Sequence, residues 1–136
     1  MSFARVFSAQ TIGLDAHAIT IEIDLSVGLH AFSIVGLPDK AVEESRDRMS
    51  AAIKNSTFEK YDPEFRPPKS YNRKITVSLA PADLKKEGPL FDLPIAIAYL
   101  IATEEVPIAQ KGKLFLGELS LDGTLRSVQG VLPLVQ

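Results

Sequence analysis

Residues 75 to 100 read ITVSLAPADLKKEGPLFDLPIAIAYL, and this stretch joins a strand to a buried helix. In residues 73–80 every second residue is apolar, which predicts a strand with one buried face: Ile75, Val77 and Leu79. Residues 81–88 are polar and predict a turn region. Residues 91–103 are apolar almost all round, which predicts a deeply buried helix. A strand that leads into such a helix favours a sheet covered by helices.

The start of this helix and a second helix upstream carry local signals. Asp92 is expected to be the N-cap, and Pro94 is tolerated in the first turn. In residues 39–55 apolar side chains recur with a period of 3.6, which predicts an amphipathic helix. Glu44 and Arg48 are four residues apart, so we expect an ion pair on its outer face.

The first 36 residues favour strands. Phe3, Val6 and Phe7 indicate a first strand before Gly13. Residues 18–25 alternate between polar and apolar side chains, and residues 29–35 predict a third strand. Gly13-Leu14-Asp15 and Ser26-Val27-Gly28 are turn sequences. Three successive strands with tight turns predict an antiparallel meander with one solvated face.

The C-terminal part predicts two short strands, 114–119 and 125–128, joined at Asp122-Gly123. Residues 130–136 read as the opening of another helix, so we expect a fragment of a longer protein. With 136 residues, the chain is expected to be one domain of the α+β class, with helices on one face of a mixed sheet.

Composition excludes several kinds of site. The absence of cysteine excludes disulfides, thiolate metal sites and a cysteine nucleophile. The two histidines, His17 and His30, are too few for a three-histidine zinc site, so no metal site is expected. No glycine has the spacing of a P-loop or a dinucleotide fingerprint. The longest apolar run, Leu93 to Ala102, has ten residues, and a membrane-spanning helix needs about 20. Because the N-terminus carries no targeting signal, we expect a cytoplasmic protein without a membrane partner.

One basic segment interrupts this slightly acidic chain, whose formal charge is −2. Residues 65–74 read FRPPKSYNRK, with two aromatic residues and no acid. Cations neutralise phosphates and aromatic rings stack on bases, so this segment is a candidate contact for single-stranded nucleic acid. The candidate nucleic-acid-binding residues are Arg66, Lys69, Arg73 and Lys74. The alternative is a solvated loop, stiffened by proline, whose charge has no partner.

Three blocks resemble one known family. They read AFSIVGLPDKAVEESRDRMSAAIKNS (31–56), ITVSLAPADLKKEGPLFDLPIAIAYL (75–100) and GELSLDGTLRSVQGVLP (117–133). They resemble the N-terminal domain of the ComM/YifB family of bacterial magnesium chelatase-like AAA+ ATPases. More distantly they resemble the Lon protease domain and the Lon-like domain of RadA. The resemblance implies a Lon-protease-like fold, similar to domain 2 of a small-subunit ribosomal protein.

The resemblance to Lon also allows a chemical test. Lon proteases use a serine and a lysine, and the matching positions in this sequence are Leu90 and Leu132. Leucine offers neither a nucleophile nor a proton acceptor, so no catalytic residue is expected at either position. The competing interpretation is that a nearby serine and a nearby lysine form the catalytic pair instead. The candidates are Ser78, Ser127, Lys85 and Lys86.

The resemblance implies a non-catalytic Lon-like domain, residues 1–136, followed in the parent protein by an AAA+ ATPase domain. No cofactor is then expected in this chain, because ATP and magnesium belong to the missing domain. The implied partners are that AAA+ domain, further copies in a ring, and DNA bound weakly. The implied role is DNA processing, such as branch migration during recombination in natural transformation. The alternatives are a divergent Ser-Lys peptidase and a domain that only binds proteins or drives assembly.

Overall fold

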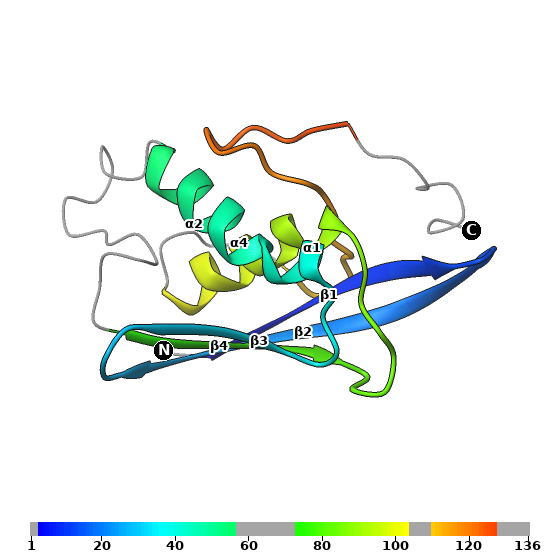
Figure 1. Ribbon diagram of the computed structural model, residues 1–136, viewed down its shortest axis with the longest axis horizontal. Helices are drawn as coiled ribbons and strands as arrows, with labels where there is room; N and C mark the ends of the chain where they lie inside the picture. Colours follow the sequence, from blue (N-terminus) through cyan, green and yellow to red (C-terminus); the bar gives the residue numbers. More distant parts are fainter. Residues whose placement is uncertain (1–2, 57–72, 104–109, 128–136) are drawn as a thin grey trace.

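The computed structural model describes residues 3–56, 73–103 and 110–127. Four strands and three helices lie within these ranges, together with one short 3-10 turn (Figure 1). The strands are β1 (Phe3–Ile12), β2 (Asp15–Val27), β3 (Ala31–Val35) and β4 (Arg73–Ala80). The helices are α1 (Lys40–Glu43), α2 (Ser45–Asn55) and α4 (Asp92–Ala102), and the 3-10 turn is η1 (Pro89–Phe91).

The four strands form one mixed sheet in the order β1-β2-β4-β3. β2 is antiparallel to both β1 and β4, whereas β3 is parallel to β4. The predicted meander of three strands is therefore wrong, because β3 does not pair with β2. The physical reason is the helical connection after β3: parallel strands need a crossover, and α1 with α2 supplies it between β3 and β4.

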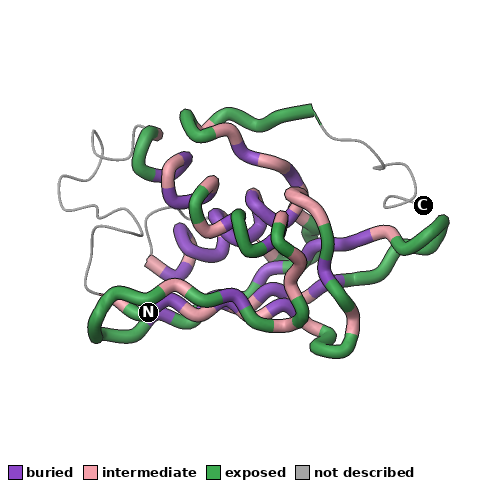
Figure 2. Tube along the Cα trace, in the orientation of Figure 1, coloured by how far each residue is buried: buried purple, intermediate pink, exposed green. Residues whose placement is uncertain are grey.

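The helices lie on one face of the sheet, as the sequence predicts (Figure 1). α4 packs directly against β1 and β2, and α2 packs against α4. Buried residues lie where the helices contact the sheet. Along the strands they alternate with more exposed residues, which lie on the opposite face of the sheet (Figure 2). β4 follows the expected alternation, since Ile75, Val77 and Leu79 are fully buried. The structure thus confirms a two-layer arrangement of helices on a mixed sheet.

The predicted helix at 39–55 forms as two pieces. Asp39 caps α1, and its carboxylate accepts a hydrogen bond from the Val42 N–H at 2.8 Å. A turn at Glu44 then separates α1 from α2. The expected apolar stripe is buried in both pieces, at Val42, Met49, Ala52 and Ile53. The Glu44–Arg48 pair also forms, with 3.6 Å between Oε1 of Glu44 and Nη1 of Arg48.

Asp92 is not the N-cap that the sequence predicts. The 3-10 turn η1 begins at Pro89, so the chain is already helical when it reaches Asp92. The cap position of α4 belongs to Phe91, and no side chain caps that end. The Asp92 carboxylate is fully buried and bonded elsewhere in the core.

The two predicted C-terminal strands are reduced to isolated contacts. Residues 119 and 125 form a single antiparallel bridge, and the Asp122-Gly123 turn closes with a 2.8 Å hydrogen bond from the Ser120 N–H to the Thr124 carbonyl. Leu114 instead forms a parallel bridge with Phe7, at the free edge of β1. The helix predicted at 130–136 lies outside the described residues.

Candidate functional site

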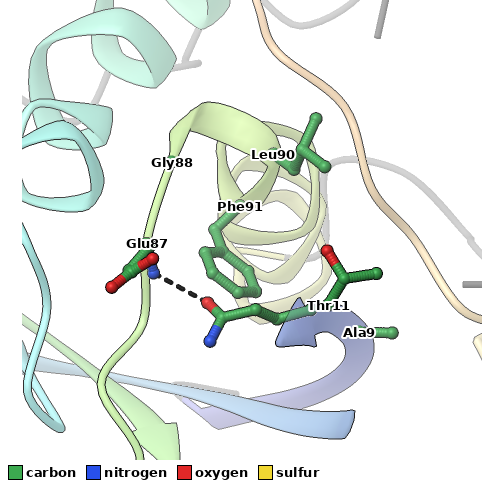
Figure 3. Close-up of a pocket in the computed structure, with 7 residues that line it drawn as sticks. Ala9, Thr11, Glu87, Gly88, Leu90 and Phe91 are labelled. Atoms are coloured by element: carbon green, nitrogen blue, oxygen red, sulfur yellow. Dashed lines mark hydrogen bonds between the residues drawn. The ribbon is translucent and has the colours of Figure 1, made fainter. Parts of the chain in front are cut away.

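A pocket of about 190 Å³ opens between the end of β1 and the turn before α4 (Figure 3). β1 contributes Ala9, Gln10 and Thr11, and the turn contributes Glu87, Gly88, Leu90 and Phe91. Its wall combines apolar side chains with an amide, a hydroxyl and a carboxylate. It is therefore suited to a ligand with both apolar and polar groups.

Gln10 fixes the turn against the strand. Its Nε2 donates to the Lys85 carbonyl at 2.7 Å. Its Oε1 accepts from the Glu87 N–H at 2.7 Å, the bond drawn as a dashed line in Figure 3. The side chain is 7% exposed, so both bonds lie away from bulk water. The amide thus binds the 85–87 backbone as a neighbouring strand would.

A second set of bonds holds the turn from the side of α1. The Gly88 N–H donates to the Asp39 carboxylate at 3.2 Å, and the Asp39 N–H donates to the Lys86 carbonyl at 2.8 Å. Gly88 has a φ of 84°, which favours glycine. The pocket wall is consequently anchored at both ends before any ligand arrives.

Leu90 lies in this pocket, at the position that the resemblance aligns with the serine of Lon. Its backbone carbonyl accepts a hydrogen bond from the Gly117 N–H at 2.8 Å, which ties the turn to residues 110–127, called the C-terminal segment below. Its side chain borders the pocket and carries no group that could attack a carbonyl. Leu132, the position aligned with the lysine, lies outside the described residues.

The hydroxyls and amines named as a substitute pair are dispersed. Ser78 stands in β4 opposite Glu22 and alternates with the buried residues, so it lies on the sheet face away from the helices. Ser127 is exposed in the C-terminal segment, and Lys85 is exposed in the turn.

Lys86 is fully buried, and its ammonium group donates to two backbone carbonyls, those of Gly36 (2.7 Å) and Pro81. Desolvation lowers the pKa of Lys86, and the nearby charge of Asp83 opposes part of that effect. Because its protons are directed at main-chain oxygens, the side chain serves to hold the 36–39 loop against residues 81–86.

The Asp92 carboxylate joins three parts of the fold. It accepts hydrogen bonds from Arg48 Nε at 2.7 Å, from the Leu119 N–H at 3.1 Å and from the Ser45 hydroxyl. The hydrogen bond to Asp92 raises the pKa of Arg48, against the opposing effect of burial. This cluster of Ser45, Arg48, Asp92 and Leu119 fixes α2, α4 and the C-terminal segment relative to one another.

The candidate nucleic-acid-binding residues are only partly described. Arg66 and Lys69 lie outside the described residues, whereas Arg73 and Lys74 are the first residues of β4. Neighbouring residues of a strand point to opposite faces, so these two cations do not share a surface. Lys74 is exposed on the open face of the sheet, where Asp24 is also exposed. The structure therefore does not unite these two residues into one basic patch.

Within the described ranges, no group of three or more His, Cys, Asp or Glu side chains is placed to hold a metal ion. In the same ranges, no helix is long and apolar enough to cross a membrane.

Sequence reasoning missed the pocket residues Gln10, Thr11 and Glu87. A lone amide in a strand is usually a surface residue, and only the fold brings it to a turn 75 residues away. Sequence reasoning also missed the ion pair between Asp92 and Arg48. It placed Asp92 at a helix cap and Arg48 on an outer helix face, and only the packing of α2 against α4 brings the two side chains together.

Taken together, the described residues define a small two-layer domain of helices on a mixed sheet, with a pocket at the edge of that sheet. The family model for "Subunit ChlI of Mg-chelatase" matches residues 21–136, and the chain belongs to that family as a ComM/YifB-type magnesium chelatase-like domain. It is 46% identical over 136 residues to "Competence protein ComM" of Haemophilus influenzae, covering 99% of this chain and 25% of that protein. It is 44% identical over 133 residues to "Uncharacterized protein YifB" of Escherichia coli, covering 97% of this chain and 24% of that protein. The chain thus spans about a quarter of the length of the curated relatives that it matches.

Proposed function

We propose that residues 1–136 are the non-catalytic, Lon-like N-terminal domain of a ComM/YifB-type AAA+ ATPase. The domain acts as a scaffold or guide for DNA rather than as an enzyme. The observation that carries this proposal is Leu90, an aliphatic side chain in the pocket where the resemblance expects a nucleophilic serine. The mixed sheet with helices on one face is consistent with a Lon-like fold.

The activity of the parent protein belongs to the same proposal. The relative named "Competence protein ComM" supports a role in DNA processing, such as branch migration during recombination in natural transformation. ATP and magnesium would bind in the AAA+ domain, which would also be this domain's immediate partner in a cytoplasmic ring of identical copies. DNA would contact the basic segment that contains Arg66, Lys69, Arg73 and Lys74.

A cleavage assay separates this proposal from a divergent Ser-Lys peptidase. The 136-residue chain is incubated with fluorescein-labelled casein, with trypsin as the positive control. We expect release of fluorescence at the rate of buffer alone, because the Lys86 ammonium is buried against main-chain carbonyls and Ser78 stands on the open face of the sheet. Turnover that disappears in Ser78→Ala or Lys86→Met would establish the peptidase instead.

A titration with single-stranded oligothymidylate tests the contact with DNA. If all four cations contact phosphates, affinity should fall roughly 50-fold between about 50 and 200 mM salt, since the slope is about −0.7 per phosphate. The double variant Arg66→Ala with Lys69→Ala should reduce that fall to about sevenfold. Lys111→Ala with Lys113→Ala removes the same charge from two exposed lysines and serves as the matched control. Absence of binding at low salt, or equal effects of the two double variants, would leave a protein-binding or assembly domain.

A further inference from the structure

β1 is an edge strand, and part of its free edge already accepts hydrogen bonds from residues 110 and 115. In the antiparallel pair with β2, alternate residues direct their backbone groups toward the partner strand and away from it. The carbonyls of Arg5 and Phe7 face away from β2, since they accept hydrogen bonds from Gln110 Nε2 (3.1 Å) and the Phe115 N–H (2.9 Å). By the same alternation, Ala9 and Thr11 direct their backbone groups to the free edge.

The C-terminal segment leaves this edge before it reaches Ala9. After Phe115 it turns toward α4: the Gly117 N–H bonds to the Leu90 carbonyl at 2.8 Å, and the Leu93 N–H bonds to the Gly117 carbonyl at 3.0 Å. The edge groups of Ala9 and Thr11 therefore have no hydrogen-bond partner within residues 3–56, 73–103 and 110–127. Ala9 is only 4% exposed, and an unpaired backbone group so close to the core is costly.

The pocket opens at this point of the edge, because Ala9 and Thr11 form one of its walls (Figure 3). We propose that it binds an extended peptide segment, which pairs with the backbone of Ala9 and Thr11 and inserts one apolar side chain against Leu90 and Phe91. The peptide would continue the strand pairing that the chain's own residues 114–115 begin at Phe7. This inference goes beyond the proposed function and does not depend on DNA binding or on the ATPase.

The chemistry of the wall defines the preferred peptide. A volume of about 190 Å³ accommodates a single side chain of the size of leucine. Glu87 adds an exposed carboxylate at the rim, which favours a lysine or arginine next to the apolar residue. The same carboxylate disfavours a phosphate backbone, so the occupant is a peptide rather than a nucleic acid.

The test is an NMR titration of the 15N-labelled 136-residue chain with the peptide acetyl-Thr-Lys-Leu-Val-Thr-amide. We expect saturable shifts of the Ala9, Thr11 and Gly88 amide signals. The same peptide methylated at its backbone nitrogens is the matched control, and it should produce no saturable shifts because it cannot donate to the edge. Equal binding of the methylated peptide, no shifts up to the solubility limit, or the same shifts with oligothymidylate would overturn the proposal.

Two variants locate the contact. Thr11→Pro removes the edge N–H while leaving the hydrogen bonds to β2, since that N–H points away from β2. Thr11→Pro should lower the affinity for the peptide by at least about fivefold, the factor for one net hydrogen bond. Thr11→Ala keeps the N–H, so its affinity should stay within about twofold of that of the unmodified chain. Leu90→Trp fills the pocket from the other side and should weaken binding without touching the strand. Unchanged affinity in both Thr11→Pro and Leu90→Trp would contradict the assigned site.

Discussion

At the scale of single residues, the Asp92 carboxylate holds α2 and the C-terminal segment to α4. It is fully buried and accepts hydrogen bonds from α2 and from the C-terminal segment. Asp92→Asn should destabilise the fold by about 3 kcal/mol, because it leaves the Arg48 guanidinium without its buried counter-charge. Urea denaturation measures the loss. Glu44→Gln removes the exposed partner of the same arginine and should cost less than about 1 kcal/mol. Similar losses in the two variants would contradict the role assigned to the buried carboxylate.

Because of Lys86, the free energy of unfolding is expected to change with pH in the alkaline range. Its pKa in the folded chain is lowered from the ordinary value of 10.5, so between the two values the unfolded chain binds more protons. Stability therefore rises as the pH increases through that window, and the cost of the buried charge is fully present below it. Relative to Lys86→Met, the unmodified chain should gain stability between neutral pH and pH 10. Parallel urea midpoints for the two proteins across that range would show that the ammonium is not desolvated.

Single residues were also where sequence reasoning was least complete. Asp92 at the start of an apolar helix matches the usual signature of an N-cap, and nothing local reveals that Pro89 has already begun the turn. Gln10 resembles a surface amide, because its partners, Lys85 and Glu87, are distant in sequence. Leu90 was identified at the sequence level because the resemblance aligned it with a residue of known role.

At the scale of elements, the turn after β3 lies in close contact with the backbone of β4. Gly36 has a φ of 108°, and a Cβ there would lie 2.1 Å from the Leu79 carbonyl oxygen in the adjacent strand. Gly36→Ala should destabilise the chain by at least about 2 kcal/mol more than Gly112→Ala, because only the first adds a backbone clash to the strain of a positive φ. Gly112 has a φ of 75° with open space around it, which makes it the matched control. Equal melting temperatures for the two variants would mean that β3 is not held this closely to β4.

The connection that follows β3 explains why the predicted strand order is wrong. Alternation predicted β4 at its observed bounds and the middle of β2 at 18–25, since local side-chain pattern sets which residues are extended. The partner of β3 depends on the connection that follows it, and α1 with α2 makes that connection a crossover to β4. Turn sequences alone do not determine which strands pair, because pairing depends on the whole sheet. The tight turns therefore favoured a meander that does not form.

At the scale of the whole molecule, the described residues form a two-layer frame of helices on a sheet, with a pocket between β1 and the turn before α4. The layer arrangement was predictable, because the buried helix at 92–102 and the one-sided strands admit few alternatives. The pocket was not, because it assembles from β1 and a turn more than 70 residues later. We propose that this frame makes contacts and breaks no covalent bonds.

The most direct test of that claim is intact-protein mass spectrometry after incubation with a fluorophosphonate, which esterifies serine hydroxyls activated by a neighbouring base. The account predicts an unchanged mass, because Leu90 offers no hydroxyl and the Lys86 ammonium is bonded to main-chain carbonyls. A time-dependent adduct on one serine, lost when that serine is replaced by alanine, would contradict it.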